Sequence, residues 1–298
     1  MAIKVYTREY AGLLANIFEV KQNFLRTFGG KIQIKDGITN KDKFMDLKTS
    51  DTDVVIQKYD TGENVAFGTG TGKSNRFGER KEIKSVDAQV EYEAPLAIHE
   101  GVDNFTVNDN VDQVINERAG LHAEAWTEEL NGMLSKALSD AASKTLTGDL
   151  TEEGVIKTFN GASKIFVNNK VARGIQRVAY VTADVYNLIV DSKLVTTAKN
   201  ATVKIDSQEY LKFKGFVLVE LADEYFQKGE NIIFAADNVG VVGVGIEVYR
   251  ILDSEDFAGV AIQAAAKYGK YIPEKNKAAI LKAKLKAVSG ATSSGAAS

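Results

Sequence analysis

Cysteine is absent from the 298-residue sequence, which excludes disulfides, thiolate zinc sites, iron–sulfur clusters and cysteine nucleophiles. Proline occurs only at Pro95 and Pro273, so collagen-like segments and proline-rich linkers are excluded. No apolar run reaches the ~18 residues of a membrane-spanning helix, and charges interrupt the N-terminal segment, which excludes a signal peptide. We therefore expect a protein that is made in the cytoplasm and has no contact with a membrane.

Charge of one sign is not in excess either, because 37 lysines and arginines stand against 40 acidic residues, a net charge of −3. A protein whose whole surface coats nucleic acid is strongly basic, so that class is excluded. Apolar residues make up 44% of the chain, which is enough to bury a sizeable core. At ~150 residues per domain, the length predicts about two domains.

Residues 54–94 are predicted to form a long hairpin with a glycine-rich tip. In the second strand, Val86–Ala94, apolar and polar residues alternate, as in a strand with one buried face. The first strand, Val54–Tyr59, begins with β-branched residues. The tip, 62–82, contains five glycines. Its large apolar residues are only Val65, Phe67 and Phe77.

This tip is too poor in apolar residues to order itself. Fixing its 21 residues costs about 20–40 kcal/mol of backbone entropy. At ~25 cal/mol per Å², compensation requires burial of roughly 800–1,600 Å² of apolar surface. Two alternatives follow: a mobile surface hairpin, or a loop ordered by a neighbouring molecule.

Residues 109–147 carry the strongest helical pattern, with Thr106 or Asp109 as the N-cap. Apolar residues recur along it every three or four positions. Its expected core residues include Ile115, Trp126, Leu130 and Leu134. At 1.5 Å per residue the helix is ~55 Å long, about the diameter of a compact chain of this length. We therefore expect a flat or elongated subunit with this helix as its spine, unless Gly120 or Gly132 introduces a kink.

The rest of the chain predicts an α/β arrangement. Thr182 is expected to cap a short helix, and a hairpin over 210–219 is expected to turn at Lys214-Gly215. The other expected helices are 152–171 and 183–190, and the other expected strands are 176–181, 232–236, 241–252, 257–268 and 278–285. Small polar residues over 289–298 predict a disordered tail.

The segment Gly68–Ser74, GTGTGKS, resembles a phosphate-binding loop, in which glycine amides and a lysine contact phosphate. The spacing from Gly68 to the Gly-Lys pair is one residue short. An apolar helix should also follow, but 74–81 is polar and broken by glycine. A nucleotide-binding enzyme that uses Gly68–Ser74 is therefore the less favoured alternative.

No other pattern predicts chemistry. His99 and His122 do not have metal-ligand spacing, and we interpret both as packed or surface residues. The glycine-rich run Gly240–Gly245 lies inside a strand pattern, which indicates a bulged or closely packed strand. The sequence has no nucleophile elbow and no convincing acid pair. We expect no catalytic residue, no metal site and no cofactor, and thus no enzyme.

Charge is distributed in blocks. The net charge is +4 over residues 1–35, +3 over 73–84 and +6 over 264–298, whereas the long helix, 109–147, carries −4. Basic extensions and an acidic helix suit subunits that overlap one another. Solvated faces with no partner explain the same blocks equally well.

The order of these segments resembles the HK97-like major capsid proteins of tailed bacteriophages. The segment Gln176–Val190, QRVAYVTADVYNLIV, is similar to the strand and capped helix of that family. The segment Ala261–Ala283, AIQAAAKYGKYIPEKNKAAILKA, is similar to its closing strand, Tyr-Gly turn and final strand. The resemblance covers nearly the whole chain and rests on layout and soft patterns.

The resemblance implies an α+β, HK97-like capsid fold. Its parts are an N-terminal arm with lead-in (1–53), an extended β-hairpin loop (54–94), a peripheral domain with the spine helix (95–159), an α/β axial domain (160–255), closing strands of the peripheral domain (256–288) and a disordered tail (289–298). The implied function is that of a major capsid protein that assembles into hexamers and pentamers of an icosahedral head around double-stranded DNA. The implied location is the virion capsid, assembled in the host bacterial cytoplasm.

The implied partners are other copies of the chain, with a separate scaffolding protein, a portal and decoration proteins as further candidates. DNA is expected to make only weak, non-specific contacts. The loop residues expected to contact a neighbouring subunit are Phe67, Lys73, Arg76, Phe77, Arg80 and Lys81. Some family members crosslink a loop lysine to an asparagine, but no matching asparagine is evident, so no crosslink is expected. An encapsulin-like nanocompartment shell and a tail-tube component remain alternatives.

Overall fold

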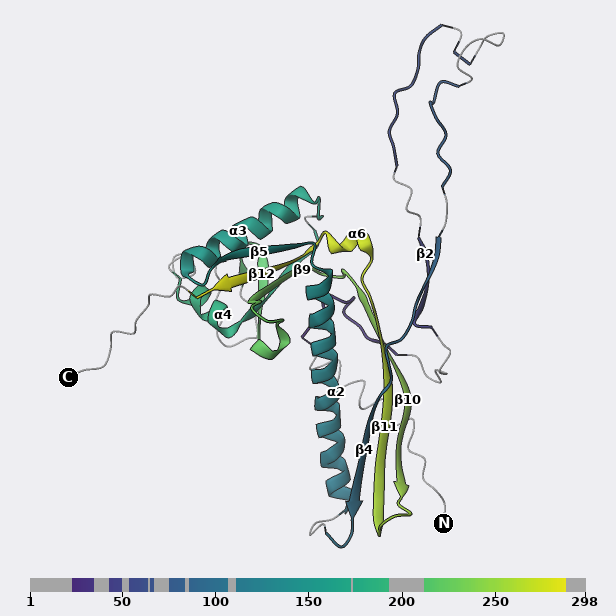
Figure 1. Ribbon diagram of the computed structural model, residues 1–298, viewed down its shortest axis with the longest axis vertical. Helices are drawn as coiled ribbons and strands as arrows, with labels where there is room; N and C mark the ends of the chain where they lie inside the picture. The colour runs from purple at the N-terminus through teal and green to yellow at the C-terminus, as the bar shows by residue number, and fades with distance from the viewer. Residues whose placement is uncertain are drawn as a thin grey trace, which may run out of the picture. The chain divides into compact units, whose positions relative to one another are not determined.

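The computed structural model describes residues 23–34, 43–49, 54–63, 65–66, 75–83, 86–106, 111–172, 174–192 and 212–287. The chain divides into two compact units. One unit is Lys43–Glu91, and the other comprises Met1–Asp42 with Tyr92–Ser298. The larger unit contains two sheets and the long helix (Figure 1).

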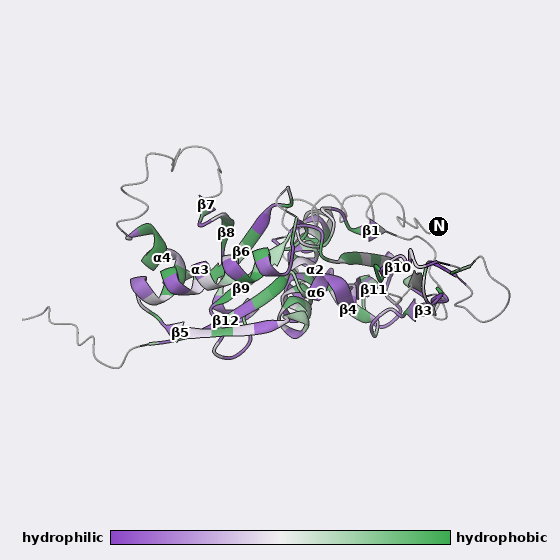
Figure 2. Cartoon of the chain, turned by 90° about the horizontal axis from the view of Figure 1, so that it is seen from above, coloured by the Kyte–Doolittle hydropathy of each residue, from purple (hydrophilic) through white to green (hydrophobic). Residues whose placement is uncertain are grey.

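A six-stranded mixed sheet forms one half of the larger unit. Its strand order is β5 (Lys144–Asp149), β12 (Ile280–Lys286), β9 (Ile232–Ala236), β6 (Arg177–Thr182), β8 (Phe216–Leu221) and β7 (Lys212–Phe213). β9 is buried along its whole length and is correspondingly green in Figure 2. Continuous apolar runs of this kind are typical of strands covered on both faces.

Two helices, α3 (Glu152–Asn168) and α4 (Ala183–Val190), accompany this sheet. The Phe159 ring of α3 packs edge-on against Phe213, Phe216 and Phe234, with ring centroids 5.0–5.8 Å apart. Thr151 caps α3, since its hydroxyl accepts a bond from the Gly154 amide. Thr182 occupies the N-cap position of α4 as expected, but its buried hydroxyl makes no capping bond.

The hairpin turn at Lys214-Gly215 is confirmed. Lys214 and Gly215 have φ angles of 49° and 87°. Consecutive positive φ angles give the turn twist that matches two paired strands, here β7 and β8.

A four-stranded sheet forms the other half of the larger unit. Its order is β1 (Gln33–Ile34), β10 (Val241–Asp253), β11 (Gly259–Tyr271) and β4 (Leu96–Asp103). Pairing of β10 with β11 shifts register between Ile246 and Val248, so the glycine-rich strand is bulged as expected. The backbone at Gly240 packs closely against Phe28 and Tyr271, because a Cβ there would lie 2.9 Å from the Phe28 ring and from the Tyr271 carbonyl oxygen.

The long helix α2 (Val111–Ala141) contacts both sheets. Trp126 packs against Tyr268 of β11, with centroids 5.8 Å apart. Further along, α2 meets β9, β12 and the short 3₁₀ helix η1 (Asp223–Tyr225). Gly120 and Gly132 do not interrupt it. Its 31 residues span ~46 Å at 1.5 Å per residue.

The expected end of this helix, at residue 147, is wrong. The helix ends at Ala141, and Lys144–Asp149 form β5. Two β-branched threonines flank Leu146, and the parallel partner of this segment, β12, lies more than 130 residues further along the chain. Pairing with β12 therefore overrides the helical pattern, which would otherwise continue through this segment.

The smaller unit contains a two-stranded antiparallel sheet, β2 (Met45–Thr49) with β3 (Val86–Val90). The expected first strand, Val54–Tyr59, is wrong. Residues 54–59 are exposed and lie outside any strand, although Val54, Val55 and Ile56 are β-branched. The register pairs Met45 with Val90, so the arms of the hairpin lie between the sheet and the tip.

The boundaries expected for the two main domains do not follow the sheets. We expected 256–288 to supply closing strands of one domain, but β11 and β12 join different sheets. Likewise, β10 lies in the four-stranded sheet rather than with β6, β8 and β9, and β5 lies in the six-stranded sheet. Such long-range pairing is not encoded in local sequence patterns.

The segment 23–30 docks onto the six-stranded sheet, as a terminal segment needs to. Phe24 and Phe28 are fully buried, and the Phe24 ring lies 4.5 Å from that of Tyr180 in β6. Arg26 pairs with Asp237 at 2.7 Å. The helix-like residues expected earlier in the arm lie outside the described residues. None of the described helices is both long and apolar enough to cross a membrane.

Candidate assembly surfaces

Large apolar side chains are exposed in the smaller unit. Val54 and Ile56 are 94% and 95% exposed, and Phe77 and Ile83 are 78% and 77% exposed. Monomeric soluble proteins seldom leave several such side chains in water on one short segment. These four residues, called the hairpin apolar set below, are the first candidate for a surface that binds another molecule.

Side chains bridge the two arms of the hairpin. Gln57 Nε2 donates to the backbone carbonyl of Glu79 at 2.8 Å, and Gln57 Oε1 accepts from the backbone amide of Glu79 at 3.0 Å. The Asp60 amide donates to the Arg76 carbonyl at 3.0 Å. Gly78 has a φ of +83°, and a Cβ there would lie 2.1 Å from Gln57 Oε1. Glycine is therefore favoured at this left-handed position.

Four of the six expected loop residues are described. Arg76 is partly buried and donates from Nε to the Val65 carbonyl at 3.0 Å. Phe77 packs edge-on against Tyr59, with centroids 5.2 Å apart, while most of its ring remains exposed. Arg80 and Lys81 are exposed. The other two, Phe67 and Lys73, lie outside the described residues, as does the whole segment Gly68–Ser74.

The expected core residues of the long helix lie in the interior. Leu130 and Leu134 are fully buried, and Ile115 and Trp126 are 8% and 6% exposed.

On another part of the chain, Phe105 is 85% exposed in the turn after β4. Its amide donates to Asp103 Oδ1 at 2.9 Å, which fixes the turn. We did not anticipate Phe105, because a single phenylalanine in a polar loop gives no periodic signal.

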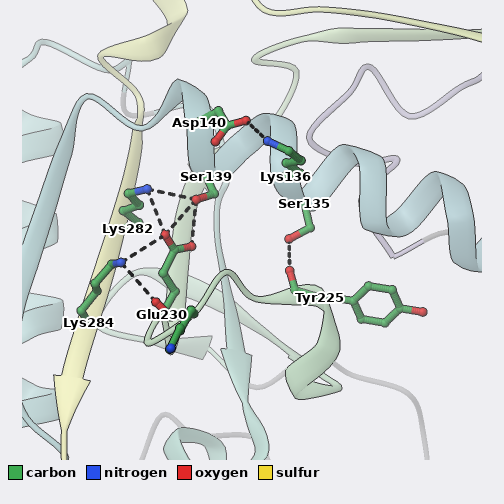
Figure 3. A network of polar contacts seen from close by, with 9 residues as sticks. Ser135, Lys136, Ser139, Asp140, Tyr225, Glu230, Lys282 and Lys284 are labelled. Carbon is green, nitrogen blue, oxygen red and sulfur yellow. Dashed lines mark hydrogen bonds and ion pairs between the residues drawn. The ribbon is translucent and has the colours of Figure 1, made fainter. Parts of the chain in front are cut away.

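A buried carboxylate fixes the last turns of α2 to the six-stranded sheet (Figure 3). Glu230 has a side-chain exposure of 1%. Its two oxygens accept from Ser139 Oγ at 2.9 and 2.8 Å, and Lys282 Nζ lies 2.9 Å from Oε1. Lys284 Nζ lies further away, 3.9 Å from Oε1. Buried charges require such pairing, so this network specifies how helix and sheet meet.

No sequence pattern predicts this network. Lys282 and Lys284 alternate with apolar residues in β12, which is the pattern of a strand with one polar face. Glu230 lies two positions before the apolar run of β9. These patterns locate the strands, but they contain no signal that Glu230 and Lys282 meet Ser139, because Ser139 is about ninety positions from Glu230 in the sequence.

A second ionic cluster holds α2 against the four-stranded sheet. Arg118 Nε donates to Glu100 Oε2 at 2.7 Å, and a second guanidinium nitrogen contacts Oε1. His122 Nε2 lies 2.9 Å from the same Oε2, and His122 is buried. The Arg118 hydrogen bond, with help from His122 and against the opposing effect of burial, lowers the pKa of Glu100 to about 2. His122 is thus a packed residue, as expected, and His99 is exposed.

This cluster predicts a loss of stability in acid. The pKa of Glu100 is lower in the folded chain than its ordinary value of 4.5, so the unfolded chain takes up the proton first as the pH falls. The stability is complete above about pH 4.5 and disappears as the pH falls towards 2. Between about pH 6 and pH 3 the native chain should lose about 1 kcal/mol more than Glu100→Gln, allowing for solvent screening.

Urea unfolding at both pH values measures this difference. Glu128→Gln, which changes an exposed glutamate of α2, is the matched control and should show the same acid-induced loss as the native chain. Equal acid-induced losses in the native chain and in Glu100→Gln would contradict the role of the cluster.

Among the described residues, no group of three or more histidine, aspartate or glutamate side chains is placed to hold a metal ion. The polar clusters that are present join helix to sheet through ion pairs. Their geometry explains how the subunit is held together, and the exposed hairpin apolar set is the feature that the fold itself leaves without a role.

No protein-family model and no curated protein matches this sequence. Solved structures do match. The mature capsid of bacteriophage PhiM1 aligns with a TM-score of 0.61 and 10% identity, over 89% of this chain and 87% of that chain. The capsid of cyanophage P-SCSP1u aligns at 0.59 and 10%, over 86% and 87%. A chain of Mycobacterium phage Che8 aligns at 0.57 and 15%, over 82% and 85%.

The identities are low, but the structural alignments extend over more than four-fifths of both chains, so they establish a common fold. The chain has the α+β, HK97-like capsid fold, with its long helix, its two sheets and its hairpin. The fold predicted from the order of segments in the sequence is therefore confirmed. Since a fold hosts more than one function, the function has to be argued from the surfaces described above.

Proposed function

We propose that this protein is a non-catalytic major capsid protein, whose copies form hexamers and pentamers of an icosahedral phage head around double-stranded DNA. The observation that carries the proposal is the hairpin apolar set, four large side chains more than three-quarters exposed on a segment with few apolar residues of its own. A neighbouring copy that covers this set would supply the missing apolar burial. The capsid fold supports such an arrangement.

Each part of the chain takes a role in this proposal. The hairpin, 54–94, would lie over an adjacent subunit, and its basic residues Arg76, Arg80 and Lys81 would meet acidic residues there. The six-stranded sheet with α3 and α4 would form the axial domain around hexamer and pentamer centres. The four-stranded sheet and α2 would form the peripheral domain. Scaffolding, portal and decoration proteins are candidate partners, and DNA would make only weak, salt-sensitive contacts.

Sedimentation velocity of the purified chain, with negative-stain images of any fast fraction, tests the proposal. We expect closed shells or rings of five and six subunits, and nuclease-resistant double-stranded DNA in shells isolated from cells. A species of 32.4 kDa at every protein and salt concentration tested, in the presence as well as the absence of a scaffolding protein, would overturn it. Small shells that enclose protein and no DNA would overturn the DNA-packaging part and indicate a nanocompartment.

A further inference from the structure

β5 is an edge strand of the six-stranded sheet. It pairs in parallel with β12, from Lys144 with Leu281 to Asp149 with Lys286, without a shift of register. Its other side has no strand partner among the residues that the structure describes, and in Figure 2 it lies at the margin of the sheet. Natural edge strands are often protected by proline or by a bulge, and β5, KTLTGD, has neither. Its open side is therefore suited to pair with a further strand.

Alternate residues of β5 direct their backbone groups to the open side. Directly after β5, the Leu150 amide donates to the Lys286 carbonyl of β12 at 2.7 Å. Because the hydrogen-bonding direction of a strand alternates from residue to residue, the even-numbered residues of β5 face β12 in the same way. Thr145, Thr147 and Asp149 then direct their N–H and C=O groups away from β12. These are the groups that a further strand would bind.

One face of β5 is turned towards α3. A Cβ at Gly148 would lie 3.4 Å from Thr158 Oγ1 of α3. Side chains alternate along a strand, so Lys144 and Leu146 share this face, whereas the odd-numbered residues lie on the opposite face and are exposed. Beside β5, a solvent-open groove of about 240 Å³ is lined by Gly148 and by Gly161 of α3. Since a Cβ at Gly161 would meet nothing within 4 Å, the groove has room for a side chain from another molecule.

Opposite charges mark the two ends of this edge. Lys144 is exposed at the start of β5. At the other end the chain turns at Leu150 and Thr151, and α3 begins with Glu152 and Glu153 and runs back along β5 (Figure 1). Glu153 also lines the groove. The edge is thus basic at one end and acidic at the other, and a second copy in the opposite direction would bring each end against its opposite.

We propose that two copies of this chain pair through their open β5 edges, antiparallel, around a twofold axis at Thr147. An axis perpendicular to the sheet places α3 of both copies on one face and sets residues opposite each other that face the same way. Leu146 of each copy then lies opposite Gly148 of the other, where the groove has room for it. Lys144 of each copy lies near Glu153 of the other.

The register follows from the residues that face outwards. With the axis at Thr147, each copy's Thr147 lies opposite that of the other, and Thr145 lies opposite Asp149. All the outward-facing residues of β5 are then paired, and each pair exchanges two N–H···O bonds. A shift of the axis by one residue towards Lys144 would leave Asp149 unpaired. The pairing does not depend on the proposed shell function.

A single cysteine tests the pairing, because the chain has none of its own. Opposed residues that exchange hydrogen bonds across an antiparallel pair have Cα atoms ~5.5 Å apart, within reach of a disulfide. Mild oxidation of folded Thr147→Cys should therefore give a disulfide-linked dimer on a non-reducing denaturing gel. The matched control is Thr145→Cys, another exposed threonine of β5. Its two copies would lie ~14 Å apart, too far for a disulfide, so it should crosslink at least about tenfold more slowly.

A mixture of two variants tests the register independently. Thr145→Cys and Asp149→Cys should each stay monomeric on the gel when oxidised alone and should form a dimer when mixed. Absence of a dimer in this mixture and in Thr147→Cys would overturn the proposal, as would equal crosslinking of Thr145→Cys and Thr147→Cys. Because the gel is denaturing, it reports the link whatever the size of the native assembly, so its result is separate from that of the shell test.

A charge exchange tests the direction of the second copy. In the Thr147→Cys chain, Lys144→Glu and Glu153→Lys should each slow crosslinking by about threefold, because each places like charges together at both ends of the edge. The two changes in one chain restore opposite charges and should return the rate to that of Thr147→Cys alone. Equal rates in all of these chains would overturn the antiparallel arrangement.

Discussion

Changing the hairpin apolar set, Val54, Ile56, Phe77 and Ile83, to serine is expected to abolish shell formation and to leave the subunit folded. These side chains are exposed in the subunit, so their removal leaves no cavity. Full burial of four such side chains against a neighbour is worth about 6–12 kcal/mol per contact. Sedimentation velocity measures assembly, and thermal unfolding of the same samples measures the fold.

The matched control changes polar, exposed positions of the same hairpin. Lys58, Glu63 and Asn75 are exposed, and their replacement by serine should leave assembly unchanged. Shells from the hairpin variant in normal yield and size would show that this surface is not the subunit interface. Loss of assembly in both variants would indicate that the hairpin is sensitive to any change, which also contradicts a specific apolar contact.

Glu230→Ala is expected to cause the largest loss of folding stability of any single charged residue described. The change leaves Lys282, whose side chain is 21% exposed, without the carboxylate that lies 2.9 Å away. Removing one partner of a buried ion pair costs about 3–5 kcal/mol. The free energy of unfolding in urea measures the loss. Glu224→Ala changes an exposed glutamate of η1 nearby and should alter stability by less than about 0.5 kcal/mol.

A double-mutant cycle separates the ion pair from the rest of the network. Lys282→Met alone should also destabilise, since it leaves Glu230 with Ser139 and the more distant Lys284. The single change Glu230→Gln and the double change Glu230→Gln with Lys282→Met complete the cycle. The double change removes both charges and should recover part of the loss, with a coupling of about 1–3 kcal/mol. Additive losses in the cycle would show that the two side chains do not stabilise each other.

The long helix shows what apolar periodicity can and cannot predict. The apolar stripe located α2 and its buried residues Leu130 and Leu134, because a helix that packs on two sheets needs one continuous apolar face. The same stripe placed its end six residues too late. Helical spacing continues through Leu146, and the competing strand partner, β12, is distant in sequence. Local patterns do not report such a partner.

In the hairpin, by contrast, local β-propensity favours the wrong segment. Val54–Tyr59 has higher β-propensity than Met45–Thr49, yet Met45–Thr49 pairs with β3. Alternation of Met45, Leu47 and Thr49 with Asp46 and Lys48 was the only signal for the true strand. The exposure of Val54 and Ile56 indicates that their apolar character serves something other than the subunit core. Whether the expected loop residues contact a second subunit stays a prediction.

The place of β12 in its sheet also has a consequence during synthesis. This strand, formed by residues 280–286, lies between β5 and β9 and is the only strand partner of β5 among the described residues. Until the ribosome has released residues 280–286, the sheet is divided and β5 is left alone with α3. Completion of the sheet therefore awaits the synthesis of β12, more than 130 residues after β5, and pairing across such a separation is slow. A nascent chain is in this way kept from completing its fold until β12 has left the ribosome.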